Sequence, residues 1–363
     1  MPEQFLHGVE VIEIDDGTRP IQTVRSATIG LVGTAPKGPV NTPTLILGSR
    51  SEAVKIFGES MPGFTIPDAL DAIFDQVGAM VVVINVADPE QHNTSINDPE
   101  LKFDTDGKIE LGYQNISNLT LKRASDSKIY ELGKDYLLDQ VKGIITRTNS
   151  IENTTKVTAS YKCLDPSKVT LGDVIGGVDS SSGDYKGVQC LLSAKSEVKV
   201  QPRILIAPGF TQQKQDDLAN PVVAEMLGIA ERLRAVIIAD CPNATKEEAI
   251  SYRQDWGSPR IYCAYPWVKV YDTATENIID QPASPRIAGL IAKSDNKRGF
   301  WWSPSNLNIN GIVGISKPID FTLGDTNSVA NYLNEHEVTT IIQQDGYRVT
   351  APHLQILSGL SCQ

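Results

Sequence analysis

The chain has 363 residues, which is enough for two or three domains at about 150 residues each. Apolar residues make up 40% and charged residues 21%, as is typical of a globular protein with a substantial core. Its 33 Lys and Arg against 44 Asp and Glu give a net charge of −11, which excludes a general binder of nucleic acid or of an anionic membrane, because both need a basic face.

Residues 1–22 are expected to form an N-terminal arm. Apolar and charged side chains alternate over a predicted strand formed by Val9, Glu10, Val11, Ile12, Glu13 and Ile14. A lone terminal strand cannot satisfy its own backbone groups, so it must join the edge of another sheet. No basic stretch followed by an apolar stretch opens the chain, so no signal peptide is predicted.

Residues 23–96 are predicted to be the first part of an α/β core. Short apolar runs at 27–33, 44–47 and 79–86 predict buried strands. Between them, a capping box at 49–52 opens one helix and Pro67 opens another, each with apolar residues at helical spacing. Near-continuously apolar strands that alternate with helices predict a mostly parallel sheet flanked by helices.

Residues 97–172 follow a different pattern. They are rich in Asn, Ser, Thr, Lys and Asp, and short alternating stretches are separated by turns such as 104–107 and 132–135. This pattern predicts a small antiparallel β domain inserted into the α/β core.

The α/β pattern resumes over residues 173–349. Apolar runs at 204–207 and 235–239 predict strands, and 221–234 between them predicts a helix. A second capping box at 245–248 opens a helix that ends near Trp256. The remaining expected elements are a strand pair at 260–264 and 267–271, helices at 283–292 and 329–335, and a last strand at 339–342.

The sequence predicts no catalytic, cofactor-binding or metal site. Gly33–Pro39 has the two glycines of a phosphate loop, but a proline replaces the lysine and two prolines remove amide donors. Five widely spaced cysteines contain no CxxC pair, and none of the four histidines accompanies a nucleophile motif. Asp240 ends a buried strand, where ligands bind in open α/β sheets, but it also fits a turn into the next helix.

Phe300, Trp301 and Trp302 are adjacent aromatic residues, which cannot all point into one core. Either one of them is buried against a neighbouring domain, or some are exposed to a partner, since aromatic residues are enriched in the cores of interfaces. The sequence alone leaves both alternatives open, so the three residues are candidate interface residues.

Several stretches, in order along the chain, resemble the contractile-tail sheath proteins of myophages and of phage-derived particles such as R-type pyocins. These stretches are 5–11, 30–41, 71–86, 173–178, 202–209, 233–245, 299–314 and 345–348. The insert resembles the small β domain of some sheaths through Tyr130, Gly133, Asp135, Tyr136 and Gly143. The resemblance implies a subtilisin-like architecture for the core; the protease residues are absent, so it implies no catalysis.

The resemblance implies a structural function. Sheath subunits polymerise around a tail tube, and a baseplate trigger lets them rearrange into a shorter, wider helix that drives the tube through a cell envelope. Expected partners are neighbouring sheath subunits, the tube protein, and baseplate and tail terminator proteins, without nucleic acid or direct membrane contact. The expected location is the virion tail, assembled in the bacterial host cytoplasm. In the family, terminal arms complete a sheet in neighbouring subunits, a role that falls here on residues 9–14.

Two other classes of function remain open on the sequence. One is a monomeric α/β binding module whose β insert recognises a ligand, and the other is an α/β hydrolase. The poverty in histidine and the absence of a nucleophile elbow weigh against the hydrolase.

Residues 350–363 do not resemble the family, in which a further α/β domain and a second arm follow the segment at 345–348. Codons for Arg348–Gln363, read from their third base, can encode Gly-Asn-Arg-Thr-Ser-Ser-Ala-Asp-Pro-Lys-Trp-Ala-Phe-Leu-Ser, which resembles the sheath continuation. We therefore hypothesise a frameshift near Arg348 and expect this chain to be a monomer or small oligomer.

Overall fold

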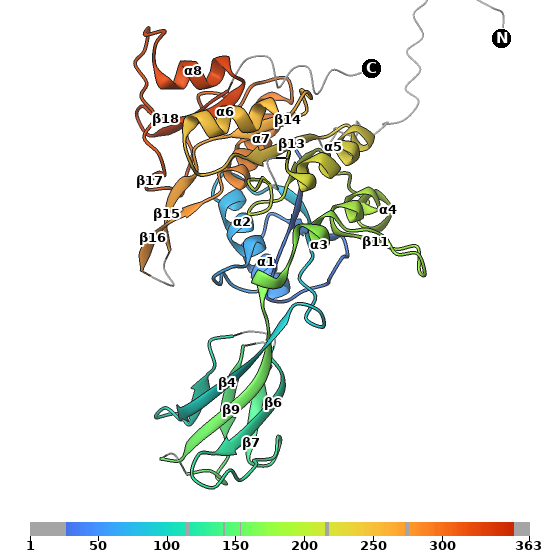
Figure 1. The fold of residues 1–363 in the computed structure, drawn as a ribbon, viewed down its shortest axis with the longest axis vertical. Coiled ribbons are helices and arrows are strands. Elements are labelled where there is room, and N and C mark those ends of the chain that lie inside the picture. Colours follow the sequence, from blue (N-terminus) through green and yellow to red (C-terminus); the bar gives the residue numbers. More distant parts are fainter. Residues whose placement is uncertain are drawn as a thin grey trace, which may run out of the picture.

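The computed structural model describes residues 27–113, 116–140, 142–152, 154–214, 218–272 and 276–351. Within them, a sheet flanked by helices forms one body, and a smaller all-β region extends from it on two adjacent segments of chain (Figure 1). The predicted arm strand at 9–14 and the segment 352–363 lie outside the described residues. No helix in the described parts of the chain is long and apolar enough to cross a membrane.

An eight-stranded, mostly parallel sheet organises the core, with the strand order β19-β18-β14-β13-β12-β1-β3-β2. Only the two outermost pairings, β2 with β3 and β18 with β19, are antiparallel. The strands are β1 (Ile29–Gly33), β2 (Thr44–Leu47), β3 (Met80–Asn85), β12 (Ile204–Ile206), β13 (Val236–Asp240), β14 (Ile261–Ala264), β18 (Val338–Gln343) and β19 (Tyr347–Thr350). The mixed α/β fold with a largely parallel sheet is thus confirmed.

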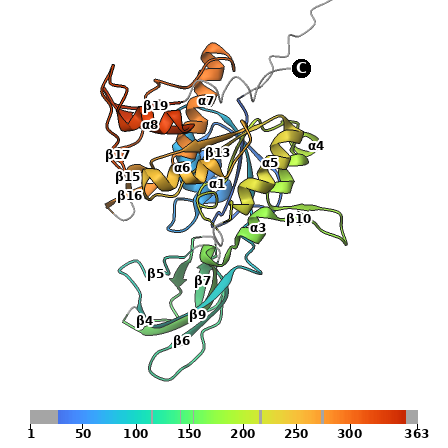
Figure 2. The same ribbon diagram turned by 45° about the horizontal axis from the view of Figure 1, so that its top comes forward.

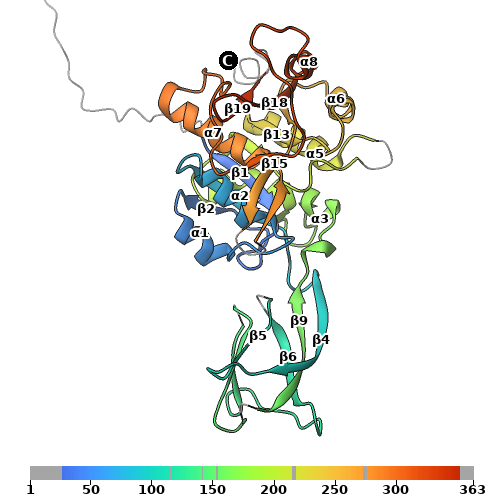
Figure 3. The same cartoon turned by 90° about the vertical axis from the view of Figure 1, so that its left-hand side faces the viewer.

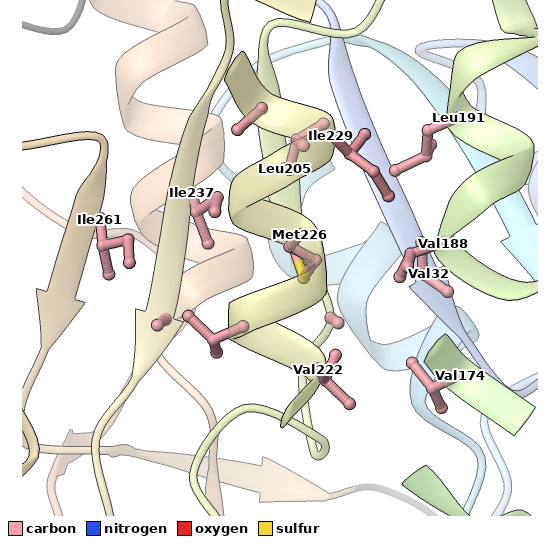
Figure 4. Close-up of a cluster of buried hydrophobic side chains, with 14 of the residues drawn as sticks. Val32, Val174, Val188, Leu191, Leu205, Val222, Met226, Ile229, Ile237 and Ile261 are labelled. Carbon is pink, nitrogen blue, oxygen red and sulfur yellow. The ribbon is translucent and has the colours of Figure 1, made fainter. Parts of the chain in front are cut away.

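Helices cover both faces of this sheet, which explains why its inner strands are apolar throughout (Figure 3). One face packs against α2 (Thr65–Phe74) and α7 (Ser284–Arg298), and the other against α5 (Pro221–Leu233) and α6 (Lys246–Gln254). In Figure 4, Val222, Met226 and Ile229 of α5 lie over side chains of the sheet. The remaining helical segments are α1 (Arg50–Phe57), η1 (Pro166–Lys168), α3 (Leu171–Ile175), η2 (Gly187–Leu192), α4 (Ala194–Glu197) and α8 (Val329–Glu335).

Three local expectations were wrong. The second helix begins at Thr65 rather than at Pro67, because the backbone N–H groups of Thr65 and Ile66 both donate to the carbonyl of Thr34. The helix predicted to end at residue 292 continues to Arg298, where Gly299 caps it. The segments 260–264 and 267–271 are not a strand pair: the first joins the main sheet as β14, and the second, β15, joins a separate small sheet.

That small sheet has the order β16-β15-β17 and lies beside the main one. It contains β15 (Val268–Asp272), β16 (Asn277–Gln281) and β17 (Gly314–Ile315). The sequence analysis did not predict β16, whose alternation is short. A two-stranded ribbon, β10 (Gly177–Val178) with β11 (Tyr185–Lys186), completes the core.

The β region consists of two three-stranded antiparallel sheets, β4-β9-β6 and β5-β8-β7 (Figure 2). Its strands are β4 (Asn93–Lys102), β5 (Lys108–Glu110), β6 (Ser117–Arg123), β7 (Tyr136–Asp139), β8 (Ile144–Arg147) and β9 (Lys156–Leu164). They enclose a hydrophobic cluster of their own, which includes Leu121, Ile145 and Val157. We refer to residues 93–164 as the insert.

Candidate functional site

Asp240 is a structural cap in this fold. It lies fully buried at the end of β13, where it accepts a hydrogen bond from the backbone N–H of Ser284 at 2.8 Å and another from the Ser284 hydroxyl. Burial raises the pKa of its carboxyl to about 6. The carboxylate therefore holds the first turn of α7, a partner 44 residues away that the sequence analysis missed.

Among the described residues, the contacts of Asp240 and Ser284 include no histidine that could act as a base. Neither His92 nor His336 contacts Ser284: His92 bonds to Asp88 and Asp173, and His336 to Tyr332. A nucleophilic serine requires a histidine or an equivalent base within hydrogen-bond reach. No group of three or more His, Cys, Asp or Glu side chains in the described ranges could hold a metal ion.

The Gly33–Pro39 segment has a packing role. A β-carbon on Gly33 would lie 2.3 Å from Thr65 Oγ1, so only glycine lets α2 pack this closely against the end of β1. The N–H of Ala35 donates to Asn85 Oδ1 at 3.0 Å, so this amide is already used within the fold. These contacts agree with the two glycines serving a turn that follows β1.

His92 lies where the insert meets the core, in a loop to which the sequence analysis gave no role. Its Nδ1 accepts the backbone N–H of Asp88 at 3.0 Å, and its Nε2 lies 3.4 Å from Asp173 Oδ2. Burial alone would raise the pKa of the Asp173 carboxyl. The hydrogen bonds from Thr170 and His92 lower it by a larger amount, so its pKa lies below the ordinary value. Asp165 N–H also donates to the His92 carbonyl at 2.8 Å, which ties the two connecting segments together.

The aromatic triplet follows α7 and faces outward. The side chains of Trp301 and Trp302 are 60% and 51% exposed, while Phe300 is half-buried and packs edge-on against Trp301 with ring centroids 5.2 Å apart. Arg298 lies over the Trp302 ring, 5.4 Å from its centroid. Gly299, with φ +91°, leaves room for the Trp301 ring to pack against its backbone. Trp301 is thus held by Gly299 and Phe300, and Trp302 by Arg298, while both rings stay exposed.

The comparisons with known proteins identify the family. A family model described as the phage tail sheath protein central domain matches residues 183–351, and one described as the tail sheath protein Gp18 domain III N-terminal region matches residues 26–86. The chain is 39% identical over 358 residues to the tail sheath protein of Burkholderia phage BcepMu, which covers 95% of this chain and 73% of that protein. The chain belongs to the phage tail sheath protein family.

Other relatives agree with this assignment. This sheath protein is 33% identical to a putative prophage major tail sheath protein of Pseudomonas aeruginosa, over 95% of this chain and 68% of that protein. Among solved structures, the anti-feeding prophage baseplate in its contracted state contains a similar fold, with a TM-score of 0.54, 14% identity, and coverage of 96% of this chain and 69% of that chain. The chain is therefore a structural protein of a tail sheath and not an enzyme.

Proposed function

We propose that this sheath protein polymerises around a tail tube in an extended helical state and contracts on a signal from the baseplate. The 39% identity to a tail sheath protein along 95% of the chain carries this proposal. Its partners would be neighbouring sheath subunits, the tube protein, and baseplate and terminator proteins. Assembly would take place in the cytoplasm of the bacterial host. A subtilisin-like architecture of the core remains an expectation from the family.

The arm at 9–14 is proposed to link subunits by adding a strand to a neighbour's sheet. Backbone pairing lets such a contact persist while the rigid cores turn relative to each other. One edge of the main sheet is already covered within the chain: the N–H groups of Asn306 and Ile309 donate to the carbonyls of Val349 and Tyr347 of β19, at 2.7 and 2.8 Å. The arm would therefore pair with another edge.

The insert is proposed to be a separate domain that decorates the outside of the tube. Its two family-matched flanks, 26–86 and 183–351, lie in the core, and its own cluster of buried side chains supports independent folding.

Trp301 and Trp302 are proposed to lie in a contact between subunits, because an exposed pair of tryptophans held by local contacts is typical of an interface core.

Co-assembly with the tail tube protein of the same phage tests the proposal. We expect striated tubes in negative-stain images and fast sedimentation of the mixture. Val11→Pro should abolish the tubes because proline removes a strand N–H, whereas the matched control Val11→Ala should retain them. A chain that stays small in the presence of the tube protein would contradict polymerisation of this chain. That result would fit either the monomer or small oligomer expected from a frameshift near Arg348 or a monomeric binding module, whereas tubes would contradict the frameshift expectation.

A further inference from the structure

A pocket of about 180 Å³ lies at the carboxyl edge of the main sheet, between the first turns of α2 and α7. Phe64 and Thr65 reach it from the start of α2, and Pro208 from the segment that follows β12. The chain runs from β1 through β2 to β3 on one side of the sheet and from β12 to β13 on the other, so the strand order reverses between β1 and β12. Open α/β sheets bind ligands outside the carboxyl ends of their strands at such a reversal.

The walls of this pocket are mostly apolar, and its polar groups are few. Apolar residues that line it are Phe64, Ala69, Ala72, Pro208, Ile279, Pro282 and Pro285. Asp68 presents a carboxylate that accepts hydrogen bonds from the Ser60 hydroxyl and, at 3.5 Å, from Gln281 Nε2. The Gln281 carbonyl oxygen accepts from Arg286 Nη1 at 3.1 Å, so this amide separates the carboxylate from the guanidinium.

The carboxylate of Asp68 takes part in no ion pair with the residues that the structure describes. None of the ion pairs within 4 Å in the described parts of the chain includes Asp68. Burial raises the pKa of its carboxyl above the ordinary value, the hydrogen bond from Ser60 lowers it by less, and the nearby charges of Asp71 and Asp272 add to the rise. Asp280, the other acidic residue of the lining, has Lys269 as its partner at 3.0 Å, so Asp68 is the carboxylate left to bind a cation.

Arg286 does not fill that role. Its side chain is 3% exposed, and its Nε has no hydrogen-bond partner. The guanidinium is held by Gln281 and by the Gly311 carbonyl at 3.3 Å, and its charge lowers the pKa of Asp68 by less than burial raises it. Burial lowers its own pKa to about 10. The pocket therefore has the buried guanidinium of Arg286 at its base, and in front of it the carboxylate of Asp68, which has no cation as a direct partner.

We propose that this pocket receives the side chain of a lysine or arginine from a neighbouring sheath subunit. The aliphatic stem would lie along the apolar walls, and the cationic head would reach Asp68. A volume of about 180 Å³ is below the roughly 300 Å³ of a typical small-molecule site, so one side chain fits better than a metabolite. An anion would meet two carboxylates, Asp68 and Asp280, in the lining. The identity of the partner rests on the proposed function.

Small cations test the chemistry of the pocket without assembly. The full chain, labelled with carbon-13 at its aspartate carboxyls, is titrated with n-butylammonium, n-butylguanidinium, butyrate and 1-butanol, and the Asp68 signal is assigned with Asp68→Asn. We expect saturable shifts of the Asp68 signal with one or both cations. Measured on the signal of Asp280, the other aspartate of the lining, which both chains retain, binding should be about ten-fold weaker or more in Asp68→Asn. Asp71→Asn, a matched change outside the lining, should retain binding.

The alternatives give distinct results. Butyrate binding would show that Arg286 governs the pocket, and equal binding of butanol would show that only the apolar walls matter; either result overturns the proposal, as does binding that survives in Asp68→Asn.

The assembled sheath tests the partner. If the wild-type chain forms tubes, Asp68→Asn and Asp68→Arg should raise the concentration needed for assembly or lower the stability of the tubes, with Asp68→Arg the more severe. An unchanged melting temperature of the isolated variant shows that its fold is intact. Tubes of unchanged stability would overturn the inference, whereas a wild-type chain that forms no tubes would contradict the proposed function and leave the cation titration to judge the pocket.

Discussion

Strand β3 of the core and strand β9 of the insert differ in how they bury their side chains. In β3 every residue after Met80 is buried, because helices cover both faces of the sheet. In β9 buried residues such as Val157, Ala159 and Tyr161 alternate with more exposed ones, because only one face meets the small interior of the insert. The core therefore depends on contacts among distant segments, whereas the interior of the insert is formed within residues 96–163.

The largest losses of unfolding free energy should come from cavities made in the core and in the insert. Leu205→Ala in β12 and Leu121→Ala in β6 each remove a fully buried side chain and should each cost about 2–5 kcal/mol. Because the two hydrophobic clusters do not share residues, calorimetry should show Leu205→Ala lowering the transition of the core and Leu121→Ala that of the insert. A single transition that both variants lower equally would show that the two regions fold as one unit.

The buried carboxylate of the core and the carboxylate at the junction should respond oppositely to pH. Asp240 has a raised pKa of about 6 against an ordinary value of 3.8, so its stabilising contribution is present below pH 3.8 and is lost as the pH rises through about 6. At about 1.4 kcal/mol per pKa unit, this loss is about 3 kcal/mol. Urea unfolding of the wild type and Asp240→Asn between pH 4 and 7 measures it, and an identical pH slope in both would contradict the assignment.

Asp173 supplies the contrast. Its hydrogen bonds with Thr170 and His92 hold its pKa below the ordinary value of 3.8, so its contribution is present above pH 3.8 and is lost as the pH falls through the lower folded value. Asp173→Asn should therefore reduce the loss of unfolding free energy below pH 3.8. Asp240→Asn should reduce the loss of unfolding free energy as the pH rises through about 6. Acid unfolding followed by circular dichroism distinguishes the two variants.

Removing the insert should have a smaller effect on the core. Asn93 pairs with Leu164, so the chain enters and leaves the insert at adjacent positions that a short Gly-Ser linker can join. We choose cuts at 92 and 165 because they keep Val169 in the core cluster, although they remove Leu164 from the same cluster. The domain boundaries at 97 and 172 stay a prediction. We expect the melting temperature of the core to change by only a few degrees. Failure to obtain any folded core would show that the insert is an integral part of it.

The smallest change in stability is expected at the exposed tryptophans. Trp301→Ala and Trp302→Ala should alter the free energy of unfolding by at most about 0.5 kcal/mol, since both side chains are more than half exposed. Either variant should nevertheless weaken tube formation with the tube protein. The matched control Tyr271→Ala removes another exposed aromatic side chain and should leave assembly unchanged. Normal tubes from both tryptophan variants would exclude the proposed interface.

The sequence predicted those parts of the fold whose signals are local. Continuous apolar runs marked β1, β3 and β13, and the capping residues Ser49 and Thr245 marked the starts of α1 and α6. It failed where distant contacts decide the structure. The strands β14 and β15 are adjacent in the chain yet belong to different sheets, and the carbonyl of Thr34 determines where α2 begins.

The candidate sites show the same limit. Asp240 stood out because it ends a buried strand, but its partner Ser284 was not visible in the sequence because their contact is made between distant segments. The exposure of Trp301 and Trp302 could not be predicted, since a run of aromatic residues is compatible with a core or an interface. The junction around His92 had no sequence signal beyond a polar loop.

Electron cryomicroscopy of tubes formed with the tail tube protein, from the full chain and from a variant that lacks 93–164, tests the central claim most directly. We predict a helical wall built from the sheet cores, with the insert as an outward projection. In the variant this projection should be absent while the helical lattice persists. The account is contradicted if neither chain forms a helical wall around the tube, or if the insert lies within the lattice and its removal abolishes the helical order.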